Sequence, residues 1–225
     1  MIRYAALILL WLACPAVAQD FITVPDDPLS DDDFYRVVAC AAAPEQPCAK
    51  PYVRWPDTAA QDLSLRIVSV APQYPNEIYT RIHSAVDNAI SQINAAGTVV
   101  QMRRAKAREI PDISIHLVAE NEGDVLQFAP DPDIAGLLMP SGYVHIWWNG
   151  KAQITRSIIL FSKDIRSDDI PSIVLEEVLQ STGLVTDIDS AYYTNTSIFA
   201  ENGPNEIIRL QGQDLRAFQQ HYTPS

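Results

Sequence analysis

Three polar side chains of one predicted helix, Glu176, Glu177 and Gln180, stand close enough to share a chemical task. They interrupt the apolar stretch SIVLEEVLQSTGL, and helical spacing places Glu176 and Gln180 on one side with Glu177 at its edge. Two adjacent carboxyl groups can share a proton, whereas ligands four residues apart can converge on a metal ion. A solvated helix face is the plain alternative. The apolar positions predict a buried arc opposite: Ile170, Val174, Leu175, Val178 and Leu179.

The spacing of the three residues is that of the metal-binding pattern H-E-x-x-H. In that pattern two histidines hold the metal, and the glutamate after the first activates the bound water. Here the five residues are E-E-V-L-Q, and Gly183 stands where the extended pattern H-E-x-x-H-x-x-G has its glycine. Both imidazoles are absent. A set of glutamate, glutamine and aspartate offers only oxygen ligands, which suit Ca²⁺ or Mg²⁺ better than Zn²⁺.

The elements that position this helix follow from the hydrophobic pattern. An alternating stretch at 63–70 predicts a strand, and an apolar stripe predicts a long helix from Pro75 to Gly97. Further strands are expected within 98–106, 112–119, 142–149 and 153–162, with a loop at 120–141 and a hairpin at Asn149-Gly150. Ser167 is the expected N-cap of the motif helix, and 205–222 supply a C-terminal helix. This order predicts an α+β fold with one mixed sheet backed by the three helices.

Four short segments carry a resemblance to a known family: LEEVLQSTGL, DIDS, TSIF and LQGQDLRAFQQHY. The order of elements is similar to the zincin metallopeptidase fold. The sequence resembles an uncharacterised family of exported bacterial proteins in the zincin clan, whose motif helix has E-E-x-x-Q in place of H-E-x-x-H. The resemblance covers residues 60–222 and implies a zincin-like single domain over 61–225.

The resemblance also implies roles for particular residues. Glu177 stands at the position of the general base, and Glu176 and Gln180 stand at two ligand positions. The usual third-ligand position falls on Thr186, which is a poor ligand. Two carboxylates close enough to replace it follow directly: Asp187 and Asp189. No cofactor is expected from this donor set, although zinc or another divalent metal stays open.

Three functions are compatible with this pattern. The first is a zincin-like domain without catalytic zinc that serves in binding or assembly in the cell envelope, with a protein or peptide partner. The second is an active hydrolase or peptidase that uses Glu176 and Glu177, with Asp189, an unusual metal or no metal. The third is a purely structural envelope protein with solvated glutamates. Two glutamates that line a concave pocket and have raised pKa values would favour the second, and full exposure of Glu176 would favour the third.

The N-terminal residues indicate the compartment. Residues 1–18 have an early Arg3, a short apolar run and the sequence Ala16-Val17-Ala18, which together predict a signal peptide cleaved before Gln19 and a periplasmic or secreted protein. A lipid anchor at Cys14 is a less favoured alternative. No membrane span is expected after cleavage. The net charge of -12 disfavours nucleic acid and anionic membrane surfaces as partners.

Residues 19–60 are expected to form an acidic extension and a lead-in to the main domain. Six aspartates and no basic residue occur within 19–35, which predicts a solvated segment with little core of its own. Cys40 and Cys48 flank a proline-containing loop, and an even pair in an exported protein predicts a disulfide.

Overall fold

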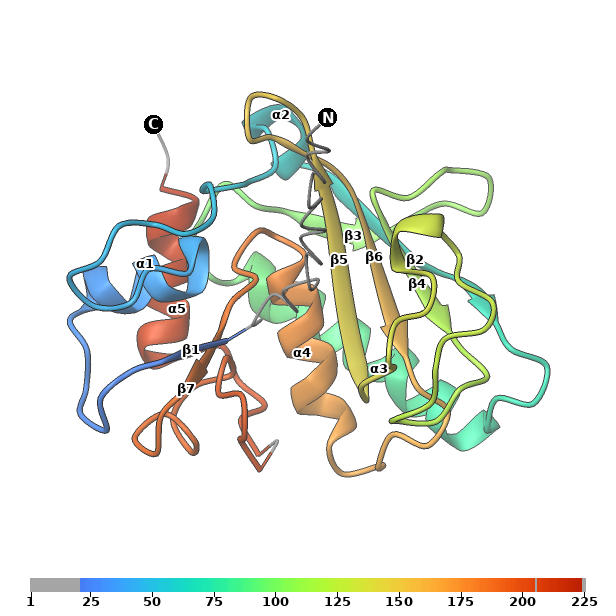
Figure 1. The fold of residues 1–225 in the computed structure, drawn as a ribbon. Coiled ribbons are helices and arrows are strands. Elements are labelled where there is room, and N and C mark those ends of the chain that lie inside the picture. Colours follow the sequence, from blue (N-terminus) through green and yellow to red (C-terminus); the bar gives the residue numbers. More distant parts are fainter. Residues whose placement is uncertain (1–20, 205, 224–225) are drawn as a thin grey trace, which may run out of the picture.

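The computed structural model describes residues 21–204 and 206–223 (Figure 1). The predicted signal peptide, Cys14 and the cleavage site lie outside these residues. Among the described residues, no helix is long and apolar enough to cross a membrane. The elements in chain order are β1 (Phe21–Thr23), α1 (Asp31–Cys40), α2 (Asp57–Ala60), β2 (Leu63–Val70), α3 (Asn76–Asn94), β3 (Met102–Arg104), β4 (Ile113–Leu117), the 3-10 helix η1 (Pro132–Ile134), β5 (Gly142–Trp148), β6 (Ile154–Phe161), α4 (Ile170–Gln180), β7 (Asp187–Asp189) and α5 (Gly212–His221).

The main sheet has five strands in the order β3-β2-β4-β6-β5. Neighbouring strands run parallel except for the β5–β6 hairpin, which places the antiparallel strand β5 at one edge. The expected strand at 63–70, the long helix, the hairpin, the motif helix and the C-terminal helix are all present. The chain is therefore a mixed helix and sheet protein, consistent with the α+β prediction.

Alternate side chains of β6 enter different cores on the two faces of the sheet. Ile159 and Phe161 join the large core shared with α3 and α4, whereas Ile158 and Leu160 join a small cluster under the loop at 120–141. In Figure 1, α4 lies between edge strand β5 and the part of the molecule formed by α1, α5, β1 and β7. The motif helix is therefore central, which explains why its apolar arc is fully buried.

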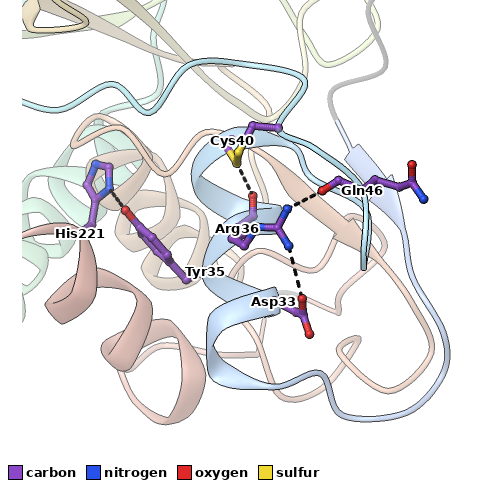
Figure 2. Close-up of a disulfide and its surroundings, with 7 residues drawn as sticks. Asp33, Tyr35, Arg36, Cys40, Gln46 and His221 are labelled. Carbon is purple, nitrogen blue, oxygen red and sulfur yellow. Dashed lines mark hydrogen bonds and ion pairs between the residues drawn. A yellow bond between two sulfur atoms is a disulfide. The ribbon is translucent and has the colours of Figure 1, made fainter.

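The acidic N-terminal segment is mostly exposed, but it is more closely connected to the rest of the fold than its composition suggests. Strand β1 pairs in parallel with β7, and Val24 and Phe34 are buried in the large core. Helix α1 packs on α5, where the Tyr35 hydroxyl contacts His221 Nδ1 at 3.2 Å (Figure 2). The predicted Cys40–Cys48 disulfide is confirmed at the end of α1. The contact with the core comes mainly from five buried residues of α1, whereas its aspartates lie in the first turn.

Some local predictions differ from the structure in detail. Helix α3 ends at Asn94, before the predicted end at Gly97, and α5 begins at Gly212, later than the start of the predicted range 205–222. Helix α4 begins at Ile170 with Asp169 as its N-cap, two residues later than Ser167 predicts, because residues 167–169 form a turn. The hairpin closes around Asn149-Gly150, but the residue with positive φ is Ala152, at 57°. Asn149 Oδ1 accepts from the amides of Lys151 and Gln153, so its side chain shapes a longer turn than a two-residue connection.

Candidate functional site

Helix α4 presents two of its three motif residues to the interior. The predicted apolar arc is confirmed, and Glu177 and Gln180 are buried as well, while Glu176 is partly buried. The glutamates are therefore not a solvated helix face. Burying two carboxyl groups with no cation beside them disfavours their charged forms, which is the electrostatic feature that sets this helix apart.

Glu177 is packed against the beginning of β5. A β-carbon added to Gly142 would lie 2.6 Å from Glu177 Oε1 and 2.5 Å from Ile173 Cγ2, so only glycine allows this approach of strand and helix. The other oxygen, Oε2, is buried without a hydrogen-bond partner in the described structure. Burial, followed by the nearby charge of Asp187, raises the pKa of Glu177 well above its ordinary value. Both causes favour the protonated form of the side chain.

Gln180 and Asp187 are joined directly. The amide Nε2 of Gln180 donates to Asp187 Oδ1 at 2.7 Å, which connects the end of α4 to strand β7. Asp187 is itself positioned by the parallel pairing of β7 with β1, in which it lies opposite Phe21. Two of the residues considered as metal ligands therefore bond to one another.

Glu176 lies among acidic groups from four separate segments. Burial raises its pKa most, and the charges of Asp187, Glu177, Glu201 and Asp214 raise it further. Sequence reasoning identified Asp187 and Glu177 in this group but missed Glu201 and Asp214, which are distant in the chain. Asp214 lies in the segment LQGQDLRAFQQHY, which carries the family resemblance, and this was the only sequence feature that pointed to Asp214.

Asp214 is the most deeply buried acid of this region. It lies in the first turn of α5, where its carboxylate accepts from Ser197 Oγ at 2.7 Å and from the Ile198 amide at 2.9 Å. Burial nevertheless raises its pKa from 3.8 to about 7, because two hydrogen bonds only partly replace the lost water. The segments TSIF and LQGQDLRAFQQHY, which both carry the family resemblance, are therefore in direct contact through Asp214.

The remaining predicted ligands do not join Glu176 and Gln180 in one coordination sphere. Asp189 Oδ2 accepts from Thr23 Oγ1 at 3.1 Å, across the β1–β7 pair. Thr186 is buried, and its hydroxyl oxygen has no hydrogen-bond partner in the described structure. Within residues 21–204 and 206–223, no group of three histidine, cysteine or acidic side chains is arranged to hold a metal ion. Together with the bond between Gln180 and Asp187, this arrangement fits a zinc ion poorly.

Three histidines have neighbours in different parts of the fold. His116 contacts Ser69 Oγ, His145 packs on Trp147, and His221 contacts the Val53 carbonyl oxygen. The rings of His145 and Trp147, two residues apart on β5, are 4.3 Å apart. Burial lowers the pKa of His221 to about 4, so it is neutral at physiological pH.

Two cavities occur elsewhere on the described surface. One of about 320 Å³ lies beside Tyr193 and Arg216, and one of about 650 Å³ lies between α3 and the segment that precedes α5. Neither is lined by Glu176 or Glu177. Glu177 is instead packed against the beginning of β5, whereas Glu176 is partly exposed.

Comparison with known proteins does not place the chain in a family. No family model matches the sequence, and no curated protein matches it either. The disulfide is compatible with a protein outside the cytoplasm, where thiols are not kept reduced.

Proposed function

We propose that this chain is an exported zincin-like protein that has no catalytic zinc and serves in binding or assembly in the cell envelope. The observation that carries the proposal is the 2.7 Å hydrogen bond from Gln180 Nε2 to Asp187 Oδ1. It joins the second ligand position of the motif to the carboxylate nearest the third. In the proposed protein this hydrogen bond joins the two residues directly, whereas in a zincin the metal ion joins the two ligand positions.

The chemistry of the donors supports the same conclusion. Zinc sites in proteins use imidazole and thiolate, with a carboxylate as a common additional ligand, and a neutral amide oxygen is a weak one. Burial raises the pKa values of both Glu176 and Glu177, so the charged carboxylates that a metal ion requires are disfavoured in this position.

The placement of α4 supports the zincin-like part of the proposal. The edge strand β5 is the antiparallel strand of the sheet, and it meets the motif helix where Gly142 contacts Glu177. Export rests on the sequence of residues 1–18 and on the Cys40–Cys48 disulfide. Intact-mass analysis of the protein from the culture fluid or periplasm tests export, and a mature chain that begins at Gln19 is the expected result.

The decisive experiment restores the histidines. We expect purified wild-type protein to contain no stoichiometric zinc, and we expect the double variant Glu176→His with Gln180→His to gain it, because two imidazole ligands then lie on α4 beside the carboxylate of Asp187. Metal content is measured by mass spectrometry after dialysis against zinc. The matched control is Glu77→His with Arg81→His, an exposed pair with the same spacing on α3.

The outcomes separate the parts of the proposal. Stoichiometric zinc in the wild type would overturn the absence of a catalytic metal. Equal zinc uptake by the α4 and α3 double variants would remove the support for a zincin-like arrangement, because two histidines four apart on any helix would then suffice. Circular dichroism of both double variants establishes that the helices are intact.

A metal-free hydrolase is the second candidate, and one observation favours it. Glu177 is a buried acid with an unpartnered oxygen and a raised pKa, as expected of a general acid. Turnover of peptide or ester substrates that disappears in Glu177→Gln but persists in Glu122→Gln, an exposed control, would establish this activity in place of a binding role. Glutamine preserves the shape of the neutral acid, so the fold is expected to tolerate the change.

A further inference from the structure

A short ribbon of backbone stands on the face of the sheet opposite the long helices. In the loop at 120–141, residues 123–126 pair with 137–139: the Leu126 amide donates to the Leu137 carbonyl and the Met139 amide to the Asp124 carbonyl, each at 2.8 Å. Val125 and Leu138 lie directly opposite one another in this pairing. Side chains that face one another across such a pair lie on the same side, so the ribbon has an inner and an outer side.

The inner side of the ribbon anchors it. Leu126 and Met139 are buried, and Ile134 from the turn of the loop joins them over β6. Ile158 and Leu160 of β6 complete this cluster. The loop therefore has a core of its own and holds its outer side chains in place before any partner arrives, which reduces the entropy lost on binding.

The outer side of the ribbon is apolar and exposed. Leu138 is 64 % exposed, Val125 is 47 % exposed, and Phe128, two residues beyond the ribbon, is 88 % exposed. A phenylalanine in this position gains nothing for the isolated fold, whereas exposed apolar groups on a fixed surface are typical of interaction sites. The three side chains come from one anchored loop, so they can act together.

Exposed acidic residues occur in the same loop as these apolar residues. The loop has no lysine, arginine or histidine, and its acids are Glu120, Glu122, Asp124, Asp131 and Asp133. Glu120 is buried, and Asp131 forms an ion pair with Arg156 at 2.7 Å. Glu122 and Asp124 are exposed, and they accept hydrogen bonds from the neutral side chains of Ser141 and Asn121, which do not neutralise their charges. A partner that covers Val125 therefore meets the carboxylates that precede it in the loop.

We propose that the loop at 120–141 is a docking surface for a cationic, apolar segment of another protein. Phe128, Val125 and Leu138 supply the apolar contact, and the exposed carboxylates of the loop select lysine and arginine at the edge of the partner. A second copy of this chain would bring like charges together, and its net charge of -12 also repels anionic lipid. Both alternatives are thus electrostatically opposed, whereas a basic partner is attracted.

The test uses a synthetic amphipathic peptide rich in lysine and leucine, and a counterpart in which glutamate replaces lysine. Isothermal titration calorimetry at about 0.15 M salt measures both against the full chain, because this salt concentration screens weak long-range attraction. We expect the lysine peptide alone to bind, and we expect Phe128→Ser to weaken it about tenfold, as for a central aromatic contact. Removing two nearby charges by Glu122→Gln with Asp124→Asn is expected to weaken it as well.

Matched variants separate this surface from general attraction to an acidic protein. Ile110→Ser removes an equally exposed apolar side chain elsewhere, at 91 % exposure, and Asp27→Asn with Glu45→Gln removes two exposed charges elsewhere. The proposal would be overturned if Ile110→Ser weakened peptide binding as much as Phe128→Ser, or if the charge variant at 27 and 45 weakened it as much as the one at 122 and 124. Equal binding of the glutamate peptide would overturn it as well. So would self-association or binding to anionic lipid vesicles that Phe128→Ser abolishes, since either result assigns the surface to another occupant.

Discussion

The buried acid Asp214 makes stability depend on pH in a direction that can be predicted. Its pKa rises from 3.8 to about 7 on folding. Between these values the unfolded chain releases the proton of Asp214 whereas the folded chain retains it, so folding is progressively weakened as the pH rises from about 4 to 7. Above pH 7 the penalty is constant. Each unit of pKa corresponds to about 1.4 kcal/mol, which gives a ceiling of about 4 kcal/mol for this group.

The variant Asp214→Asn isolates this effect. Asparagine has the shape of the protonated acid: its amide nitrogen can donate to Ser197 Oγ and its oxygen can accept from the Ile198 amide, the two groups that contact Asp214 now. Arg216, which lowers the pKa of Asp214, and Glu176, whose pKa Asp214 raises, stay in place. The variant should therefore match the wild type near pH 4 and exceed it increasingly up to pH 7.

Urea unfolding at a series of pH values, followed by tryptophan fluorescence, measures this difference. Trp55 is buried, so its emission should report loss of the core. Other titrating groups, including His221, occur in both proteins and cancel in the difference to first order. Asp31→Asn is the control, because Asp31 is exposed and Arg216 lowers its pKa, which predicts a small effect of opposite sign. A difference between Asp214→Asn and wild type that stays constant from pH 4 to 8 would refute the reasoning.

Three further predictions concern packing and covalent restraint. Gly142→Ala should cost about 1–3 kcal/mol in the free energy of urea unfolding, because the new methyl group meets the Glu177 carboxyl. Gly183→Ala should cost more than about 3 kcal/mol, and thermal unfolding should detect it, because Gly183 has φ of 115° and the methyl group would lie 1.9 Å from the Val53 carbonyl oxygen. Breaking the disulfide with Cys40→Ser and Cys48→Ser together should cost about 2–3 kcal/mol, measured by urea unfolding against the oxidised wild type, because the bridge closes a short loop. An unchanged unfolding midpoint in any of the three would contradict its stated contact.

Hydrophobic periodicity predicted most of the main sheet and its helices. The strand at 63–70, the helix from Asn76 and the apolar arc of α4 are strongly periodic, so a local pattern contained enough information. The pairing of the N-terminal segment with β7 was not predicted, because β1 and β7 have three residues each and form only by pairing across the chain. No local pattern can indicate a partner more than a hundred residues away.

The sequence indicated the polar residues of α4, but it did not indicate their contacts with distant segments of the chain. Helical spacing predicted Glu176, Glu177 and Gln180 as one polar group on a single helix, whereas in the structure Glu177 packs against β5 and Gln180 bonds to Asp187. The sequence did not indicate that Gln180 would bond to Asp187, since that contact depends on the path of the turn between α4 and β7. The burial of Glu177 was equally hidden, because it depends on a glycine 35 positions earlier in the chain that admits its carboxyl.

The hydrogen bonds of the C-terminal third explain how the motif helix is held. Asp214 accepts hydrogen bonds from Ser197 Oγ and the Ile198 amide. The carbonyl of the next residue, Phe199, accepts from the Ile188 amide at 2.7 Å. Ile188 is the central residue of β7, so these bonds connect α5 to the strand that carries Asp187, which also pairs with β1. The acid in α5 and the amide in α4 are thus linked by one series of hydrogen bonds through β7. A change in the charge of Asp214 would reach the motif in two ways: through this connection, and directly through the pKa of Glu176, which the charge of Asp214 raises.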